Sequence, residues 1–244
     1  MPWRSPLLGG SPGAGLDERD HPPLRMDLIR LCVLGVALRI AVAVLWAPAP
    51  TGDAVDYLRL AEGLLNGDGF RNTNGLPTSW RPPLYPIFLA LVVGSAGVDG
   101  ATPHALIRIC QALIGTASVL LVYFVGRLWF GRTVGWIAGL LMATSFAQVA
   151  AVSRVLSETL FVFLLLAGIA LASVGWTGGR GQRAGEEWSS TYAWPYLASG
   201  FCLGLATLAK GALLPFAPVL ALGIVGVSLR LQGRSSIRWT LPRA

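Results

Sequence analysis

The sequence has little charge and few of the residues that bind metals or form disulfides. Charged residues make up 13% of its 244 residues, whereas about a quarter is usual for a soluble domain. The two histidines, His21 and His104, cannot form a metal cluster by themselves. The three cysteines, Cys32, Cys110 and Cys202, all fall within apolar runs, so we expect no disulfide framework. These scarcities exclude an ordinary soluble domain and a disulfide-stapled one.

Long apolar runs take the place of the missing charge. Hydrophobic residues make up 54% of the sequence, and the mean hydropathy is +0.61. A membrane span needs roughly 20 mostly apolar residues. We therefore expect an integral membrane protein with an all-α fold, a polytopic transmembrane helical bundle. About six runs qualify as spans, namely Leu28–Trp46, Leu106–Phe130, Val134–Val152, Thr159–Trp176, Tyr196–Ala209 and Ala212–Leu229.

The net charge of +7 is the excess of 19 basic over 12 acidic residues, and every basic residue except Lys210 is an arginine. Because the arginines flank apolar runs, membrane orientation explains them, and we expect no nucleic-acid partner. The run Leu84–Gly97 decides the topology, since roughly 14 residues are short for a span. If it crossed, the positive-inside rule would be broken by Arg127, Arg132, Arg180, Arg183, Arg230, Arg234, Arg238 and Arg243. We therefore predict a juxtamembrane helix there.

This topology predicts the organisation of the chain. Residues 1–26 are rich in Pro and Gly and form a disordered cytoplasmic tail. Residues 27–230 form the transmembrane region, with an external loop at about 48–104 and with Glu158 on the same outer face. Residues 231–244 form a basic cytoplasmic tail, which we expect to be a truncated end. The arginine, alanine and glycine bias indicates a bacterial genome, hence the bacterial cytoplasmic (inner) membrane.

The external loop carries a predicted amphipathic helix from Ala54 to Asn66. Its apolar residues recur at helical spacing, so we expect it to lie on the membrane surface. Asp53 stands at its N-terminal boundary, and two interpretations remain open. The carboxylate could accept backbone N–H bonds as a helix cap. It could instead be a general base that activates an acceptor hydroxyl for attack on a sugar carbon.

If the sugar comes from a lipid phosphate, the reaction also needs a cation beside the leaving phosphate. Arg81 and Lys210 are both predicted on the outer face, although each could simply be an anchor at the membrane interface. Glu158 could pair with Arg154 or cap the following helix. Asp56 lies in the first turn of the amphipathic helix, where the helix dipole already favours a carboxylate.

Several short motifs occur in a fixed order along the chain. They are Gly52-Asp53-Ala54-Val55-Asp56-Tyr57, Leu60-Ala61, Arg81-Pro82-Pro83-Leu84-Tyr85, Val122-Tyr123, Gly126-Arg127-Leu128, Phe130-Gly131 and Ser157-Glu158. Together, over residues 27–230, they resemble the N-terminal half of the GT-C membrane glycosyltransferases. The most similar members are the protein O-mannosyltransferases and the aminoarabinose lipid A transferases.

The resemblance implies a glycosyltransferase with a polyprenyl-phosphate sugar donor, an active site at the outer face and inversion at the sugar carbon. The family's loop aspartate falls on Asp53, its phosphate-binding basic residue on Arg81 and a second acidic position on Glu158. The predicted substrate-binding set comprises Arg81, Glu158, Asp56, Tyr57, Tyr85 and Lys210.

The resemblance leaves the cofactor and the acceptor open. Ala54 and Trp80 stand where the family often has acidic residues, which argues against the metal site of the lipid A transferases. The resemblance establishes no cofactor with certainty, and a divalent metal stays an open alternative. The acceptor is a protein, a lipid or a glycan. Alternative functions are a non-catalytic membrane module that binds a lipid carrier, a transporter, or an inactive truncated product.

Overall fold

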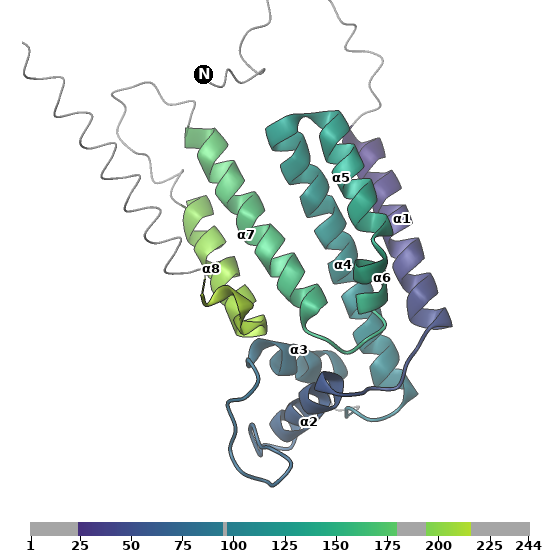
Figure 1. The fold of residues 1–244 in the computed structure, drawn as a ribbon, viewed down its shortest axis with the longest axis vertical. Coiled ribbons are helices and arrows are strands. Elements are labelled where there is room, and N and C mark those ends of the chain that lie inside the picture. Colours follow the sequence, from purple (N-terminus) through teal and green to yellow (C-terminus); the bar gives the residue numbers. More distant parts are fainter. Residues whose placement is uncertain (1–23, 95–96, 180–193, 216–244) are drawn as a thin grey trace, which may run out of the picture.

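The computed structural model describes residues 24–94, 97–179 and 194–215. Within these residues there is no β-strand, and the sole β-type pairing is an isolated bridge between Arg71 and Pro77. Figure 1 shows two parts, a bundle of long helices side by side and a small helical layer across one end of it. The expected all-α membrane bundle is confirmed.

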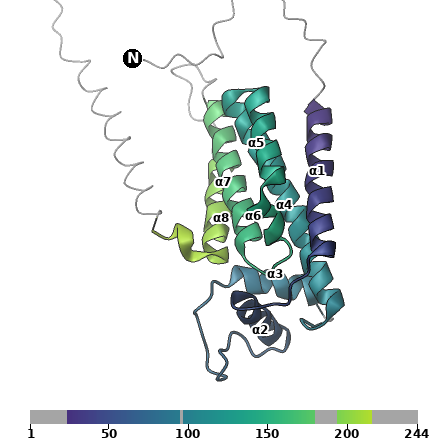
Figure 2. The same ribbon diagram turned by 45° about the vertical axis from the view of Figure 1, so that its right-hand side comes forward.

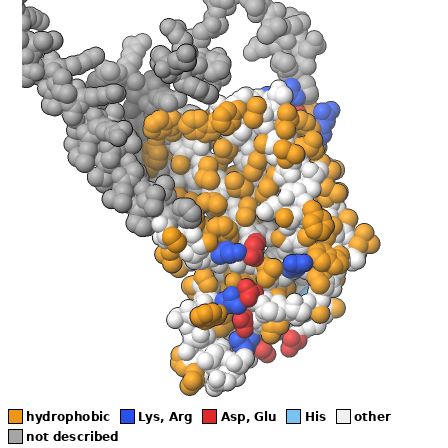
Figure 3. Space-filling model, viewed as in Figure 1, with side chains coloured by type: hydrophobic (Ala, Val, Ile, Leu, Met, Phe, Trp, Pro, Cys, Tyr) orange, Lys and Arg blue, Asp and Glu red, His pale blue; other side chains and the backbone are white. Residues whose placement is uncertain are grey.

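The bundle and the layer use different helices. The helices of the bundle are α1 (Leu24–Leu45), α4 (Ala101–Phe130), α5 (Arg132–Thr144), α6 (Phe146–Ala151), α7 (Glu158–Gly179) and α8 (Trp194–Ala209). The layer contains α2 (Asp53–Leu65) and α3 (Leu84–Val93), and a short 3₁₀ turn, η4 (Gly211–Leu213), follows α8. Among the described residues, α1, α4 and α7 are long and apolar enough to cross a membrane. Figure 3 shows a broad apolar band over the bundle, with charged side chains gathered toward its two ends.

Several predicted boundaries differ from the structure. The predicted span Val134–Val152 is divided at Ser145, which separates α5 from α6. α1 begins at Leu24, inside the stretch that the sequence assigned to a disordered tail. Residues 1–23 and most of the sixth predicted span, Ala212–Leu229, lie outside the described residues, as does the basic tail 231–244.

The break at Ser145 is stabilised by Arg39, a charged residue inside the first predicted span. The side chain is fully buried, and its guanidinium donates to the carbonyls of Met142 and Ala143, each at 3.4 Å, and of Gly35 at 3.2 Å. The last carbonyls of a helix lack intrahelical partners and attract cations. Arg39 therefore caps the C-terminal end of α5 from α1, and its partners are backbone carbonyls.

Small residues let α4 and α5 pack closely. A Cβ atom at Gly126 would lie 2.9 Å from the Cα atom of Gly135, and one at Gly139 would lie 2.8 Å from Leu31. Close approach of this kind is the usual use of spaced glycines in membrane helices. Gly135 and Gly139 therefore serve close helix packing. Gly131 differs, because it ends α4 with a φ of 89° that favours glycine.

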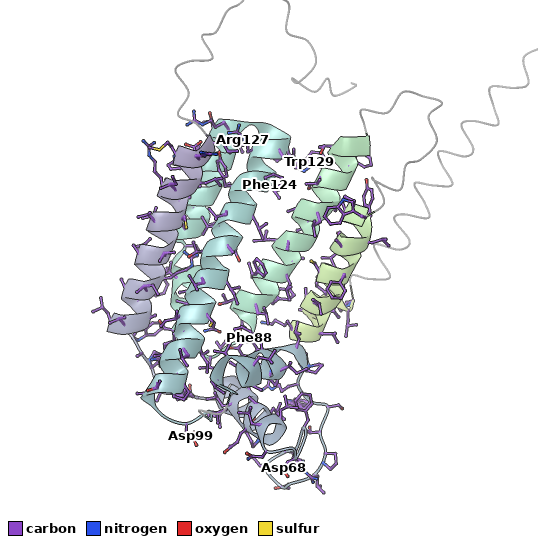
Figure 4. The ribbon with its side chains drawn as sticks, turned by 180° about the vertical axis from the view of Figure 1, so that it is seen from behind. Asp68, Phe88, Asp99, Phe124, Arg127 and Trp129 are labelled. Atoms are coloured by element: carbon purple, nitrogen blue, oxygen red, sulfur yellow. The ribbon has the colours of Figure 1, made fainter. Side chains whose placement is uncertain are left out.

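An ionic cluster ties three helices together at the end of the bundle that faces away from α2. Asp27 on α1 accepts two hydrogen bonds from Arg132 at 2.7 and 2.9 Å, and a third from the hydroxyl of Tyr123 at 3.1 Å. Figure 4 shows Arg127, which donates to the Tyr123 hydroxyl, at this end of the molecule. Asp68 and Asp99 mark the opposite end. The two ends are therefore chemically distinct.

The helical layer differs from its prediction in one respect. α3 lies across the end of the bundle (Figures 1 and 2), as expected for a run too short to cross. α2, in contrast, does not present its apolar face to a membrane surface. Tyr57 and Ala61 are 5% and 0% exposed, and they pack against Leu89 of α3, Ile107 of α4 and Val155. The amphipathic pattern was correct, but protein covers the apolar face.

Candidate active site

The candidate site is built around Arg81, which lies between two carboxylates of α2. Its Nη2 atom lies 2.5 Å from Oδ1 of Asp53 and 3.0 Å from Oδ2 of Asp56. Asp53 is the first residue of α2, with Gly52 at the N-cap position and no capping hydrogen bond from a side chain. The interpretation of Asp53 as a helix cap is therefore wrong, and so is its expected place before the helix.

The two aspartates differ in how many of their carboxylate oxygens accept a hydrogen bond. Oδ1 of Asp56 lies 2.8 Å from Nη2 of Arg59, and Oδ2 of Asp56 binds Arg81. The Asp56 side chain is 33% exposed. Asp53 is 56% exposed. Within the described residues the Asp53 side chain makes one hydrogen bond, which Oδ1 accepts from Arg81. Asp53 thus keeps one carboxylate oxygen open to water, whereas both oxygens of Asp56 are held.

Arg81 is held in a charged form. Burial alone would lower its pKa, but the hydrogen bonds that Arg81 donates to Asp56 and Asp53 outweigh that cost, so the pKa of Arg81 is raised. Its guanidinium carbon lies 5.5 Å from the ring centre of Tyr57, within the range of a cation–π contact. A permanently charged, oriented guanidinium suits a phosphate group.

Tyr57 and Tyr85 pack against each other in the buried layer next to Arg81. Their rings meet edge to face at 4.9 Å, and the Tyr57 hydroxyl lies 3.2 Å from Oγ of Ser157. Tyr85 is 0% exposed, and burial raises its pKa well above its ordinary value, so it acts as a neutral donor. Both rings are buried and support the site in this structure, and their role in substrate binding stays a prediction.

Gln111 is a residue of the site that the sequence did not single out. This side chain of α4 is 1% exposed and accepts the Tyr85 hydroxyl at 2.7 Å. It also donates to the carbonyl oxygens of Val152 and Arg154, at 3.0 and 2.8 Å. One amide therefore joins α3, α4 and the loop before α7. A lone glutamine within an apolar span was the signal that could have revealed it.

Replacing Gln111 with leucine is expected to lower the free energy of unfolding by about 3 kcal/mol or more. The change leaves a buried hydroxyl and two carbonyls without a partner, and each such loss costs about 1–3 kcal/mol. Thermal or denaturant unfolding of the purified protein measures the effect. Gln148→Leu is the matched control, because Gln148 lies on α6 with a partly exposed side chain and should change stability little. Equal stability of the two variants would contradict this role of Gln111.

A second ion pair joins α7 to the end of α8. Lys210 donates to Oε1 of Glu158 at 2.7 Å, and the two side chains are 40% and 42% exposed. The predicted partner of Glu158, Arg154, instead lies over the ring of Trp46, with 5.3 Å from its guanidinium carbon to the ring centre. Oε2 of Glu158 is buried and has no hydrogen-bond partner within the described chain. Glu158 therefore keeps one acceptor oxygen without a donor among the described residues.

A largely apolar cavity of about 390 Å³ opens beside Arg81. Its walls come from the segment before α3 and from the end of α8, and they include Trp80, Pro83, Leu208 and Leu214. Among the described residues, Arg81 is the only charged one that lines it. A ligand with an apolar chain and an anionic head would find complementary surfaces there.

Metal ligands are not gathered in the part of the chain that the structure describes. No group of three or more His, Cys, Asp or Glu side chains could hold an ion within these residues. Asp53 and Asp56 share the guanidinium of Arg81. The charge arrangement seen at the site is thus a network of carboxylates with basic side chains.

Comparisons with known proteins agree with this architecture. Residues 77–240 match the model of the dolichyl-phosphate-mannose-protein mannosyltransferase family. The structure is similar to the crystal structure of the Archaeoglobus fulgidus oligosaccharyltransferase tethered with an acceptor peptide, with a TM-score of 0.65 and 18% sequence identity. That match covers 81% of this chain and 25% of the oligosaccharyltransferase, so the chain spans about a quarter of that protein's length. A comparison with curated proteins found no match.

The family match covers more than half of the chain, whereas the structural similarity at 18% identity concerns the fold alone. The family match includes Arg81 and Glu158, and it begins after Asp53. The apolar helices α1, α4 and α7 agree with an integral membrane protein. The chain belongs to the dolichyl-phosphate-mannose-protein mannosyltransferase family, within the GT-C membrane glycosyltransferases.

Proposed function

We propose that the protein transfers a sugar from a polyprenyl-phosphate donor to a hydroxyl group, with inversion, at the outer face of the bacterial cytoplasmic membrane. The observation that carries the proposal is the pairing of Asp53 with Arg81 at the mouth of an apolar cavity. This arrangement supplies a base, a phosphate-binding cation and room for a lipid chain. Because the family is one of protein mannosyltransferases, we propose a polypeptide as the acceptor, with a serine or threonine that provides the hydroxyl.

The reaction requires one base and one cation. The acceptor hydroxyl oxygen forms a bond to the sugar's anomeric carbon, and the bond from that carbon to the phosphate oxygen breaks. Asp53 takes the hydroxyl proton on its open oxygen. The phosphate leaves with the electron pair, and Arg81 balances its charge. Attack from the side opposite the phosphate inverts the configuration of the sugar carbon.

The ion pair between Arg81 and Asp53 gives the two substrates an order. Arg81 holds Oδ1 of Asp53 through its Nη2 atom. A carrier phosphate that binds Arg81 would compete with Asp53 for the Nη2 atom. Donor binding therefore releases Asp53 for proton abstraction.

Glu158 and Lys210 complete the proposed substrate-binding set. Oε2 of Glu158, which is buried and lacks a donor among the described residues, would accept a hydrogen bond from a sugar hydroxyl of the bound donor. Lys210 holds Glu158 in place and adds a second positive charge at the same end of the bundle. Asp56 positions Arg81 and does not itself contact the sugar, since both of its oxygens are already bonded.

A transporter would need ionisable groups near the middle of its spans. The cluster of Asp53, Arg81 and Glu158 lies instead at one end of the bundle, and the buried Arg39 is used as a helix cap. The test of the enzyme proposal is a transfer assay on the full-length protein in nanodiscs. It uses polyprenyl-phosphate mannose labelled in the sugar and a threonine-containing peptide. Binding of the carrier without transfer of any polyprenyl-phosphate sugar would favour the non-catalytic module.

The proposed orientation predicts labelling of the Asp53 end of the molecule from outside the cell. In a cysteine-free background, Thr73→Cys and Arg154→Cys should both react with a membrane-impermeant maleimide in intact cells, because both positions are exposed at that end. Ser157→Cys should react slowly, since Ser157 is 2% exposed. Labelling of the first two positions only after the cells are permeabilised would reverse the orientation.

A further inference from the structure

A second hollow lies at the connector between α1 and α2. It has a volume of about 280 Å³ and is lined by residues that include Trp46, Pro48, Pro50, Thr51, Ala54 and Arg154. It shares no lining residue with the cavity at Arg81. Figures 1 and 2 show α1, which leads into this hollow, and α8, which lines the other, on opposite sides of the bundle.

Both hollows reach the first turn of α2. The apolar cavity reaches it through Arg81, which is bonded to Asp53. The second hollow reaches it through Thr51 and Ala54, which lie on either side of Asp53 in the sequence. An inverting displacement brings the attacking and leaving oxygens to opposite sides of the sugar carbon. If the phosphate lies at Arg81, the attacking hydroxyl must approach from the side of the second hollow.

The second hollow also carries uncompensated positive charge. No acidic residue lines it, and Arg154 has no carboxylate partner within the described residues. Arg108 lies behind the wall and donates to the carbonyls of Pro48 at 3.4 Å and Ser153 at 3.3 Å, without a carboxylate. In contrast, Arg81, Arg59 and Lys210 at the neighbouring site are all paired with carboxylates. An unpaired positive pocket favours an anionic ligand group.

The geometry of Arg154 suits recognition of a carboxylate. Its guanidinium lies over the face of Trp46, and this stacking restricts its orientation while the N–H groups at the edge stay available. A guanidinium edge binds a carboxylate through two parallel hydrogen bonds. Pro48 and Pro50 fix the backbone torsions of the connector that forms the facing wall. The pocket is therefore rigid on one side and charged on the other.

We propose that this pocket, defined by Trp46, Pro48, Pro50 and Arg154, receives the acceptor polypeptide, and that Arg154 selects serine or threonine acceptors with an acidic side chain close by. The inference rests on the proposed transferase function for its polypeptide acceptor. It adds a binding site for the second substrate and a residue that determines which acceptors bind. Arg154 is not a catalytic residue, because it contacts the flanking part of the acceptor.

Peptide binding tests the inference without turnover. The full-length protein is placed in nanodiscs of phosphatidylcholine, and fluorescent peptides with a central threonine are compared, one with a flanking glutamate and one with glutamine. Anisotropy should give about fivefold tighter binding of the glutamate peptide, the effect expected of a partly exposed ion pair. Arg154→Gln should abolish this preference, and Arg154→Glu should transfer it to a peptide with a flanking lysine.

The matched control is Arg71→Gln. Arg71 is an exposed arginine of the loop between α2 and α3 that donates only to backbone carbonyls within the described chain, so its loss should leave the preference unchanged. Equal affinity of the wild-type protein for both peptides would overturn the inference, as would a preference that survives Arg154→Gln. Arg154-dependent retention of phosphatidylglycerol, with no effect on the peptides, would assign the pocket to a lipid and also overturn it.

The two proposals fail in different ways. If the Arg154-dependent peptide preference is found and no sugar is transferred, the pocket is a binding site and the transferase function is wrong. If sugar is transferred and the preference is absent, the pocket inference alone is wrong. Polyprenyl phosphate binding that depends on Arg154 and not on Arg81 would place the donor in this pocket and overturn the inference.

Discussion

Replacing Asp53 with asparagine is expected to lower turnover by roughly 10² to 10⁴, the usual contribution of a general base. The amide keeps the size of the side chain, and its oxygen can still accept the hydrogen bond from Arg81. It cannot accept the proton of the attacking hydroxyl. The loss should therefore appear in turnover, with little change in the affinity for the donor. The measurement is the transfer of labelled sugar by the full-length protein.

Asp56→Asn is the matched control, because Asp56 lies one helical turn further along α2 and also binds Arg81. Both of its oxygens are held, by Arg59 and by Arg81, so it offers no open oxygen to an acceptor. Its replacement should cost far less turnover than Asp53→Asn. Near-normal transfer by a folded Asp53→Asn protein would remove Asp53 from the role of base. Equal losses in the two variants would show that both carboxylates serve only to orient Arg81.

Removing Arg81 is expected to have the second-largest effect, a loss of donor affinity of about 10- to 100-fold in Arg81→Ala. This range corresponds to hydrogen bonds with a charged partner, which contribute about 1.5–3 kcal/mol. Arg81→Lys should lose less, because an ammonium keeps the charge and gives up the two-point contact with phosphate oxygens. Binding of polyprenyl phosphate to the protein in nanodiscs measures both variants.

Removing Arg81 also changes the ion pairs of Asp53 and Asp56. Without Arg81, Asp53 loses its only cationic partner among the described residues, while Asp56 keeps Arg59. Arg59→Ala is the control, since it removes a cation from Asp56 and leaves Arg81 in place. That variant should bind the donor nearly as well as the wild-type protein. Equal affinity for polyprenyl phosphate in the wild-type, Arg81→Lys and Arg81→Ala proteins would remove Arg81 from the phosphate site.

The pattern of the sequence was sufficient for the fold class and for the grouping of the site. Apolar runs of span length predict membrane helices because a lipid environment requires each segment to satisfy its own backbone hydrogen bonds. The shortness of Leu84–Gly97, together with the distribution of arginines, predicted that it does not cross. That prediction brought Asp53, Arg81 and Glu158 to one end of the bundle, where the structure shows them. These features follow from composition and length, which are local properties of the chain.

Tertiary structure alone decided which partners these residues have. The periodicity of α2 identified its apolar face, but period cannot tell whether lipid or protein covers that face, and here α3 and α4 cover it. The pairing of Lys210 with Glu158 joins residues 52 positions apart. Likewise, Gln111 and Arg39 satisfy carbonyls on other segments. Hydrogen bonds require distances near 3 Å, and only the packed positions of the helices bring such atoms that close.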